Sequence, residues 1–308
     1  MFLLNASFLG ILKSIPSSIS EGLAWGILAL GVYLSFRVLD IPDMSVDGTF
    51  ALGGAVTAVL IVNGVNVILA MLVSVIAGAI AGTITGLLHT KLKIPAILSG
   101  ILVMFAMYSV NIRIMDGSSI SLLKQPTMIN QILSWLSIDK SLLQIILFAL
   151  FAAAVIAAIY WFFGTSLGSA IRATGCNSQM ARAQGIDTDS KIIIGLAIGN
   201  ALAALAGSLI AQFNNNNTVD IGNGAIVIGL SAIVIGELIF RGNLPFWAKL
   251  TGVIVGSILY RFVIRLALQL GIGKVTDMKL ITAVILAIVM GFSFVKKSKH
   301  LKGEKRHA

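Results

Sequence analysis

Long apolar runs constrain this chain more than any other feature. Residues 145–163 form a run without one charged side chain, and further predominantly apolar stretches of about 17–25 residues follow one another along the sequence. A helix of that length crosses the hydrocarbon core of a bilayer with all of its backbone hydrogen bonds made internally. Only 11% of the 308 residues are charged and 57% are hydrophobic, too little polar surface for a globule in water. The sequence therefore predicts an all-α, polytopic integral membrane protein in contact with lipid.

Hydropathy divides the chain into about nine candidate spans within one transmembrane domain that covers residues 1–308. Some of these helices are expected to be broken or short. The first 14 residues lack the basic start and the small-residue cleavage site of a removed signal, so they are expected to form a short interfacial helix. The predicted spans are 16–38, 46–64, 66–89, 95–112, 141–163, 192–212, 225–240, 246–270 and 278–295.

The distribution of basic residues predicts the orientation in the membrane. With alternating spans, fourteen of the 22 Lys and Arg residues fall on one side, including Arg241 and the basic tail at 296–308. Cytoplasmic loops carry an excess of Lys and Arg, so the tail and the loop at 164–191 are predicted to be cytoplasmic. The net charge of +10 thus reflects topology. No nucleic-acid partner is expected, because the chain has no soluble basic face.

Glycines predict how the spans pack and how they are related. Gly78, Gly82 and Gly86 recur on one helix face, a spacing typical of close helix packing. The segments "DGTFALGGAVTAVLI" from Asp47 and "GNGAIVIGLSAIVIG" from Gly222 are both glycine-punctuated openings of a short apolar helix. In the predicted topology they cross in opposite directions, which indicates an inverted repeat of the kind found in transporters.

One polar stretch, "SAIRATGCNSQMARAQGIDTDSK", interrupts the apolar segments. Asn177 is a good helix N-cap and Gly185 can adopt the left-handed conformation that ends a helix. The short helix between them is expected to expose Arg182 while Ala181 stays small, so that another protein can approach closely. A helix resting on lipid is the alternative, but the segment lacks the apolar face that such helices need.

The longer segment "LGSAIRATGCNSQMARAQGIDTDSKIIIGLAIGNALAALAGSL" resembles the coupling region of permease subunits in the branched-chain amino acid and ribose class of ABC importers. "LDIPDMSVDGTFALGGAVTAVL" is similar to a second segment of these permeases, in a version linked to aromatic amino acid uptake. The resemblance implies a multi-pass protein of the bacterial plasma membrane that works as a homodimer around one central pathway. It also implies two partners, a separate ABC ATPase subunit and an extracytoplasmic substrate-binding protein. It implies a coupling site formed by Arg172, Gly175, Asn177, Ala181, Arg182 and Gly185.

Residues 39–49 are expected to interrupt a helix inside the membrane. Pro42 and Gly48 prevent one unbroken helix, and the backbone groups they free must line a cavity or be buried in protein. Asp47 is interpreted either as the N-cap of the helix that begins near Thr49 or as a group that passes a substrate ammonium. The predicted pathway residues are Asp43, Ser45, Asp47, Gly48 and Thr49.

Two arginines lie in the eighth predicted span. Arg261 and Arg265 are one helical turn apart, and their long side chains are expected to reach the lipid headgroups. The alternative is that they meet acidic residues of a binding protein or a substrate carboxylate.

Absent motifs exclude several classes. The sequence has no G-x-x-x-x-G-K-[ST] phosphate loop, one cysteine and three histidines, so neither ATP hydrolysis, metal binding nor a cofactor is expected on this chain, and it is not predicted to be an enzyme. The predicted function is the permease subunit of an ATP-driven importer, with amino acids as the expected substrates. A sugar or nucleoside permease, an ion-coupled secondary transporter and a membrane scaffold are the alternatives.

Overall fold

The computed structural model describes residues 2–135, 139–240, 242 and 244–269, with the single positions 280, 283, 284 and 287. The ninth predicted span, Arg241 and the basic tail lie outside the described residues. Within them, eight helices are long and apolar enough to cross a membrane. Seven begin and end within four residues of their predicted bounds, and the span predicted at 225–240 begins six residues earlier, at Val219. These candidate spans are Ile15–Val38, Ser45–Val62, Val67–Thr90, Ala96–Met115, Lys140–Gly164, Thr188–Asn214, Val219–Ile239 and Phe246–Gln269.

The chain is helical almost throughout its described part. Helix α1 (Phe2–Tyr33) passes through Pro16 without a break and continues into the π-helical turn η1 (Leu34–Val38). The interfacial position of residues 1–14 therefore stays a prediction. The other elements are α2 (Ser45–Val62), α3 (Val67–Thr90), α4 (Ala96–Met115), β1 (Ser119–Ser121), α5 (Met128–Trp135), α6 (Lys140–Gly164), α7 (Ser166–Cys176), α8 (Ser178–Ala183), α9 (Thr188–Asn214), β2 (Asn216–Thr218), η2 (Val219–Gly222), α10 (Ala225–Ile239) and α11 (Phe246–Gln269).

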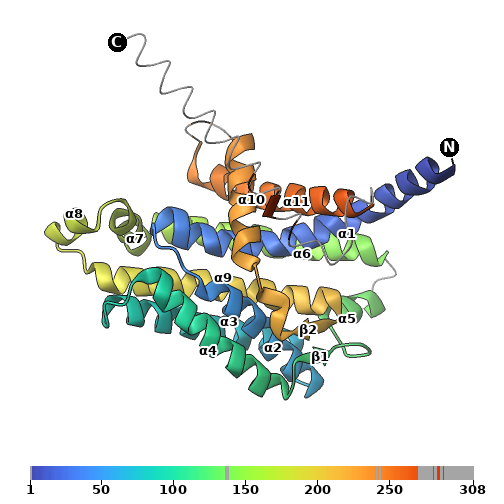
Figure 1. The fold of residues 1–308 in the computed structure, drawn as a ribbon, viewed down its shortest axis with the longest axis horizontal. Coiled ribbons are helices and arrows are strands. Elements are labelled where there is room, and N and C mark those ends of the chain that lie inside the picture. Colours follow the sequence, from blue (N-terminus) through green and yellow to red (C-terminus); the bar gives the residue numbers. More distant parts are fainter. Residues whose placement is uncertain are drawn as a thin grey trace, which may run out of the picture.

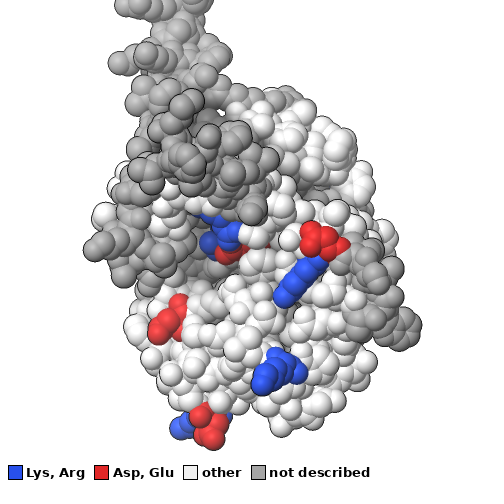
Figure 2. Space-filling model, turned by 90° about the vertical axis from the view of Figure 1, so that its right-hand side faces the viewer, with Lys and Arg blue, Asp and Glu red and all other residues white. Residues whose placement is uncertain are grey.

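The molecule has two distinct ends. Helices α7 and α8 lie together at one end, and the antiparallel pair β1–β2 lies at the opposite end beside α5 (Figure 1). Most long helices run between these ends, and α10 is inclined to them (Figure 1). At the β1–β2 end, charged side chains are scattered over an otherwise uncharged surface (Figure 2).

Helix α9 lies at the centre and packs against α1, α2 and α3. The predicted close packing of glycines is confirmed here, because all three glycines of α3 face α9. A methyl group on Gly82 would lie 2.3 Å from the carbonyl oxygen of Leu196, and one on Gly78 would lie 2.6 Å from that of Asn200. Small residues thus let the two backbones approach closely, which replaces the hydrophobic driving force that lipid does not supply.

Burial is uneven among the spans. The span formed by α1 and η1 is 83% buried, whereas α4 is only 28% buried and exposes much of its apolar face. Trp25 of α1 stacks on Phe50 of α2 with their ring centroids 4.7 Å apart, which joins these helices in the core.

The two arginines of α11 are placed differently from the prediction. Arg261 Nη1 lies 3.1 Å from Glu21 Oε1 of α1, and Arg265 Nη2 lies 2.9 Å from Glu21 Oε2. The Arg261 guanidinium also lies 4.3 Å from the ring centroid of Trp25. The predicted reach to lipid headgroups is therefore wrong for Arg261, whose side chain is only 10% exposed. A charge buried in a span requires a partner, and Glu21 supplies it.

Candidate functional site

The predicted interruption at 39–49 is present in the structure. After η1, residues 39–44 form no helix, and α2 begins at Ser45. Asp40 lies in this break and has a positive φ of 56°, a left-handed conformation that does not continue a helix. Ser45 lies beside Asn200 in the middle of α9, so α2 begins deep within the bundle. Pro42 lies within this break, where it interrupts no helical hydrogen bond.

Asp43 fastens this break to the central helix. Its carboxylate accepts hydrogen bonds from Ser45 N at 2.9 Å, from Ser45 Oγ at 2.6 Å and from Asn200 Nδ2 at 2.7 Å. The side chain is 1% exposed, and these three donors satisfy a carboxylate that would otherwise be costly to bury. Asp43 therefore ties the start of α2 to α9.

Asp47 lies in the first turn of α2 and bonds to a different helix. Its oxygens accept hydrogen bonds from Gly224 N at 2.9 Å and from Ile226 N at 2.8 Å, where α10 begins. A carboxylate at a helix N-terminus satisfies free amides and complements the helix dipole. The prediction that Asp47 caps its own helix is thus wrong, because that helix begins two residues earlier.

The two segments that were paired in the sequence meet at this point. A methyl group on Gly222 would lie 1.9 Å from the carbonyl oxygen of Asp47, so only glycine fits against the first turn of α2. Helices α2 and α10 therefore begin side by side in the bundle and are joined through Asp47.

A cavity of about 350 Å³ adjoins this junction. Asp47 and Gly48 line it, together with residues of α4 and η2. Asp43, Ser45 and Thr49 are enclosed instead, at 1%, 0% and 0% exposure. The five predicted pathway residues thus separate into two that line the cavity and three that are enclosed by protein.

The polar helix of the second predicted site forms as expected. Asn177 Oδ1 accepts a hydrogen bond from Met180 N at 2.9 Å, and Gly185 has a positive φ of 79°. Both the predicted N-cap and the predicted left-handed stop are therefore confirmed. Between them α8 covers only six residues.

The exposed surface of α8 differs from the prediction. Ala181 is 4% exposed and points into the protein, so it cannot be the surface residue that a partner approaches. Met180 is 64% exposed at the neighbouring position. Sequence reasoning overlooked it, although a methionine on a short polar helix is itself a signal of an adaptable contact surface.

Arg182 joins α8 to the start of α9. Arg182 Nε donates to Thr188 Oγ1 at 2.8 Å, and Arg182 Nη2 lies 2.9 Å from Asp189 Oδ1.

Asp187 is the N-cap of α9 and accepts hydrogen bonds from the side chain and backbone of Ser190, which hold the pKa of its carboxyl below the usual value. This N-cap is therefore ionised at neutral pH, where it complements the helix dipole.

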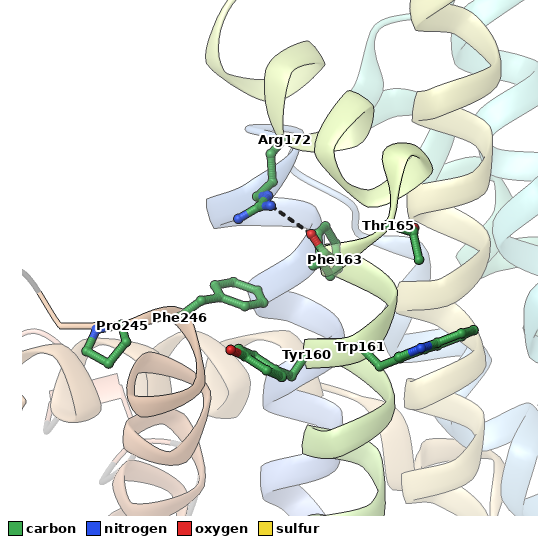
Figure 3. Close-up of a pocket in the computed structure, with 8 residues that line it drawn as sticks. Tyr160, Trp161, Phe163, Thr165, Arg172, Pro245 and Phe246 are labelled. Carbon is green, nitrogen blue, oxygen red and sulfur yellow. Dashed lines mark hydrogen bonds between the residues drawn. The ribbon is translucent and has the colours of Figure 1, made fainter.

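Arg172 and Gly175 attach α7 to the body of the protein. Arg172 Nη2 donates to the carbonyl oxygen of Phe163 at 2.7 Å, and its guanidinium lies 5.7 Å from the ring centroid of Phe246 (Figure 3). Arg172 lines a cavity of about 560 Å³ together with aromatic side chains from the end of α6 and the start of α11 (Figure 3). A methyl group on Gly175 would lie 1.9 Å from the carbonyl oxygen of Val38, so α7 contacts η1 backbone to backbone.

Turn η1 therefore has neighbours on two sides. It contacts α7 through Val38, and its Arg37 forms an ion pair with Glu237 near the end of α10. π-Helical turns are rare and often occur at functional positions. Here the turn lies directly before the break that leads to Asp43.

In the part of the chain that the structure describes, eight apolar spans, two helices that begin inside the bundle and a capped polar helix at one end are the features expected of a multi-pass membrane permease. The chain belongs to the family described as the permease component of branched-chain amino acid transport systems, whose model matches residues 14–291. It is thus a transport subunit of an ABC-type import system, in a family that is not enzymatic.

Named relatives cover most of the chain. It is 39% identical over 275 residues to the tyrosine transport system permease protein of Clostridioides difficile. The aligned region covers 89% of this chain and 90% of that protein. It is 26% identical over 264 residues to the ribose import permease protein RbsC of Escherichia coli, covering 86% of this chain and 80% of RbsC. It is 30% identical over 241 residues to the autoinducer 2 import system permease protein LsrC of Photorhabdus luminescens, covering 77% and 67%. No solved structure matches the chain.

Proposed function

We propose that this chain is the permease of an ATP-driven importer of amino acids, with aromatic amino acids as the preferred substrates. The similarity to a tyrosine transport permease over 89% of the chain supports this substrate class. In this proposal two copies form a homodimer in the bacterial plasma membrane, each bound to an ABC ATPase subunit on the cytoplasmic side. An extracytoplasmic binding protein delivers the substrate at the β1–β2 end.

The observation that carries the proposal is the direct contact between the α7–α8 region and the break before α2. Helix α8 presents Met180 to the ATPase, and Arg172 and Gly175 transmit its movement to the body of the permease. Because Gly175 packs on the backbone of Val38 with no room for a side chain between them, a shift of α7 must also shift η1. The chain leads from η1 directly to Asp43, which is bonded to Asn200 of α9.

A second route reaches the other short helix. The ion pair between Arg37 and Glu237 joins η1 to α10, whose opposite end is bonded to Asp47. A movement of η1 thus reaches α2 and α10 together. Packed helices move between discrete arrangements, so these linked shifts suit a mechanism in which the pathway opens to one side at a time.

Co-purification and uptake together test the proposal. The permease is co-expressed with its ABC ATPase, purified and reconstituted in vesicles, with the binding protein added on the extracytoplasmic side. We expect the ATPase subunit to co-purify in an amount equal to the permease, and the vesicles to show ATP-dependent uptake of L-tyrosine. A Met180→Asp variant is expected to insert normally and to lose both the bound ATPase and the uptake. Uptake driven by an ion gradient in the absence of any ATPase would refute the proposal.

A further inference from the structure

The cavity beside Asp47 has one wall that the pathway prediction did not include. Helix α4 contributes four of its lining residues, Met104, Phe105, Tyr108 and Asn111. Phe105 is 66% exposed and Tyr108 is 46% exposed, so two aromatic rings stand at the open side of the cavity. Asp47 and Gly48 of α2 form the opposite wall.

Asn111 is the unusual member of this set. It is fully buried, and its Nδ2 donates a hydrogen bond to the carbonyl oxygen of Gly48 at 3.3 Å. Because that carbonyl can only accept, the amide nitrogen must face it and Oδ1 must face elsewhere. Among the described residues Oδ1 has no hydrogen-bond partner. A buried acceptor without a partner is rare in proteins and calls for an explanation.

We propose that the cavity is a substrate-binding site in which Asn111 Oδ1 and the Asp47 carboxylate accept hydrogen bonds from the substrate's ammonium group. Phe105 and Tyr108 pack against its apolar or aromatic side chain. This inference rests on the proposed function, and it names the residues that contact the substrate and the group they recognise. Asn111 is then a specificity-determining residue. Its Oδ1 is buried without a partner among the described residues, and it is satisfied when the side chain turns toward a donor in the cavity.

The chemistry of the wall favours an ammonium over other groups. The residues described around the cavity contribute one carboxylate and no basic side chain, so a cation is stabilised there and an anion is not. Each Asp47 oxygen accepts one backbone amide and keeps a lone pair for a further donor. A sugar would supply hydroxyl donors but no charge to balance Asp47. The volume of about 350 Å³ lies within the range of small-molecule sites.

Protection from thiol labelling tests the site without relying on transport. Cys176, the single cysteine, is replaced by Ser, and a cysteine is introduced by Asn223→Cys at an exposed position that lines the cavity. The purified full-length permease in lipid nanodiscs is labelled with a maleimide while L-tyrosine, L-phenylalanine or ribose is titrated. The matched control is Ala153→Cys, an exposed position on α6 that does not line this cavity.

We expect both aromatic amino acids to slow labelling at position 223 and not at 153, and ribose to have no effect at either. Asn111→Leu should raise the tyrosine concentration for half-protection about tenfold, because a hydrogen bond to a charged group is lost. Phe105→Ala, at an exposed position, should also weaken protection and keeps the test usable if Asn111→Leu fails to fold.

The outcomes separate the two proposals. Unchanged labelling in tyrosine, or equal protection by ribose, overturns the site even if the assembled complex imports tyrosine. Protection that Asn111→Leu and Phe105→Ala leave intact also overturns it. Protection that these variants abolish, in a permease that associates with no ATPase, supports the site and refutes the proposed function.

Discussion

Removal of the Asp47 carboxylate should loosen α10 from α2. Asp47→Ala deletes both acceptors of the bonds from Gly224 N and Ile226 N, at 2.9 and 2.8 Å. A hydrogen bond to a charged group contributes about 1.5–3 kcal/mol, so loss of both bonds should cost about 3–6 kcal/mol of folding free energy. Asp47→Asn keeps one acceptor oxygen and turns its amide nitrogen toward the second amide, so it should lose about half as much.

The loss can be measured by titrating the purified permease in mixed micelles with a denaturing detergent. We expect stability to fall in the order wild type, Asp47→Asn, Asp47→Ala. Asp220→Ala is the matched control, because it removes a nearby exposed carboxylate whose hydrogen-bond partner among the described residues is the side chain of Asn223. Its cost should stay below about 1 kcal/mol. If Asp47→Ala were as stable as this control, the two bonds would not hold α10 in place.

The remaining predictions concern the α7–α8 end and the buried charges. Gly175→Leu should uncouple ATP hydrolysis from uptake or prevent assembly, since even a methyl group there would lie 1.9 Å from a backbone oxygen. Substrate-stimulated ATP hydrolysis would test this, with Gly164→Leu as the control because a side chain at position 164 meets open space. Gly185→Val should strain the left-handed stop of α8 by about 1–2 kcal/mol and speed amide exchange of that helix, and unchanged exchange would argue against it. The exposed Cys176 should react with an impermeant maleimide in inverted vesicles and not in intact cells; the reverse pattern would overturn the topology. Glu21→Ala should cost about 3–5 kcal/mol in detergent denaturation because it leaves a buried arginine unpaired, whereas Asp189→Ala should cost far less.

The spans and the local capping could be predicted because both depend on neighbouring residues. Hydropathy over about 20 residues fixes where a helix leaves the membrane, and α6 begins and ends within one residue of the predicted 141–163. The cap of α8 required only Asn177 and the stop only Gly185. These features follow from backbone geometry that no distant contact overrides.

The partners of charged groups could not be predicted, because they depend on contacts far apart in the sequence. Asp47 bonds to an amide 177 positions later, and a local pattern shows only that a carboxylate lies near a helix start. The inward direction of Ala181 was also missed, since a six-residue helix is too short to reveal which face is buried. Asn111 gave no signal at all, because a single amide in an apolar helix has many structural roles.

The ion pair between Glu21 and Arg265 joins residues 244 positions apart, and this distance bears on how the protein is made. At about 5–20 residues per second, the ribosome needs roughly 12–50 s to reach the arginines after Glu21 has emerged. During that interval the first helix holds an acidic group for which lipid offers no partner. We therefore expect α1 to remain near the insertion machinery, or at the bilayer surface, until α11 has been synthesised. A nascent chain stopped before Arg261 should then be degraded rather than inserted stably, because α11 supplies the partner that Glu21 of α1 requires.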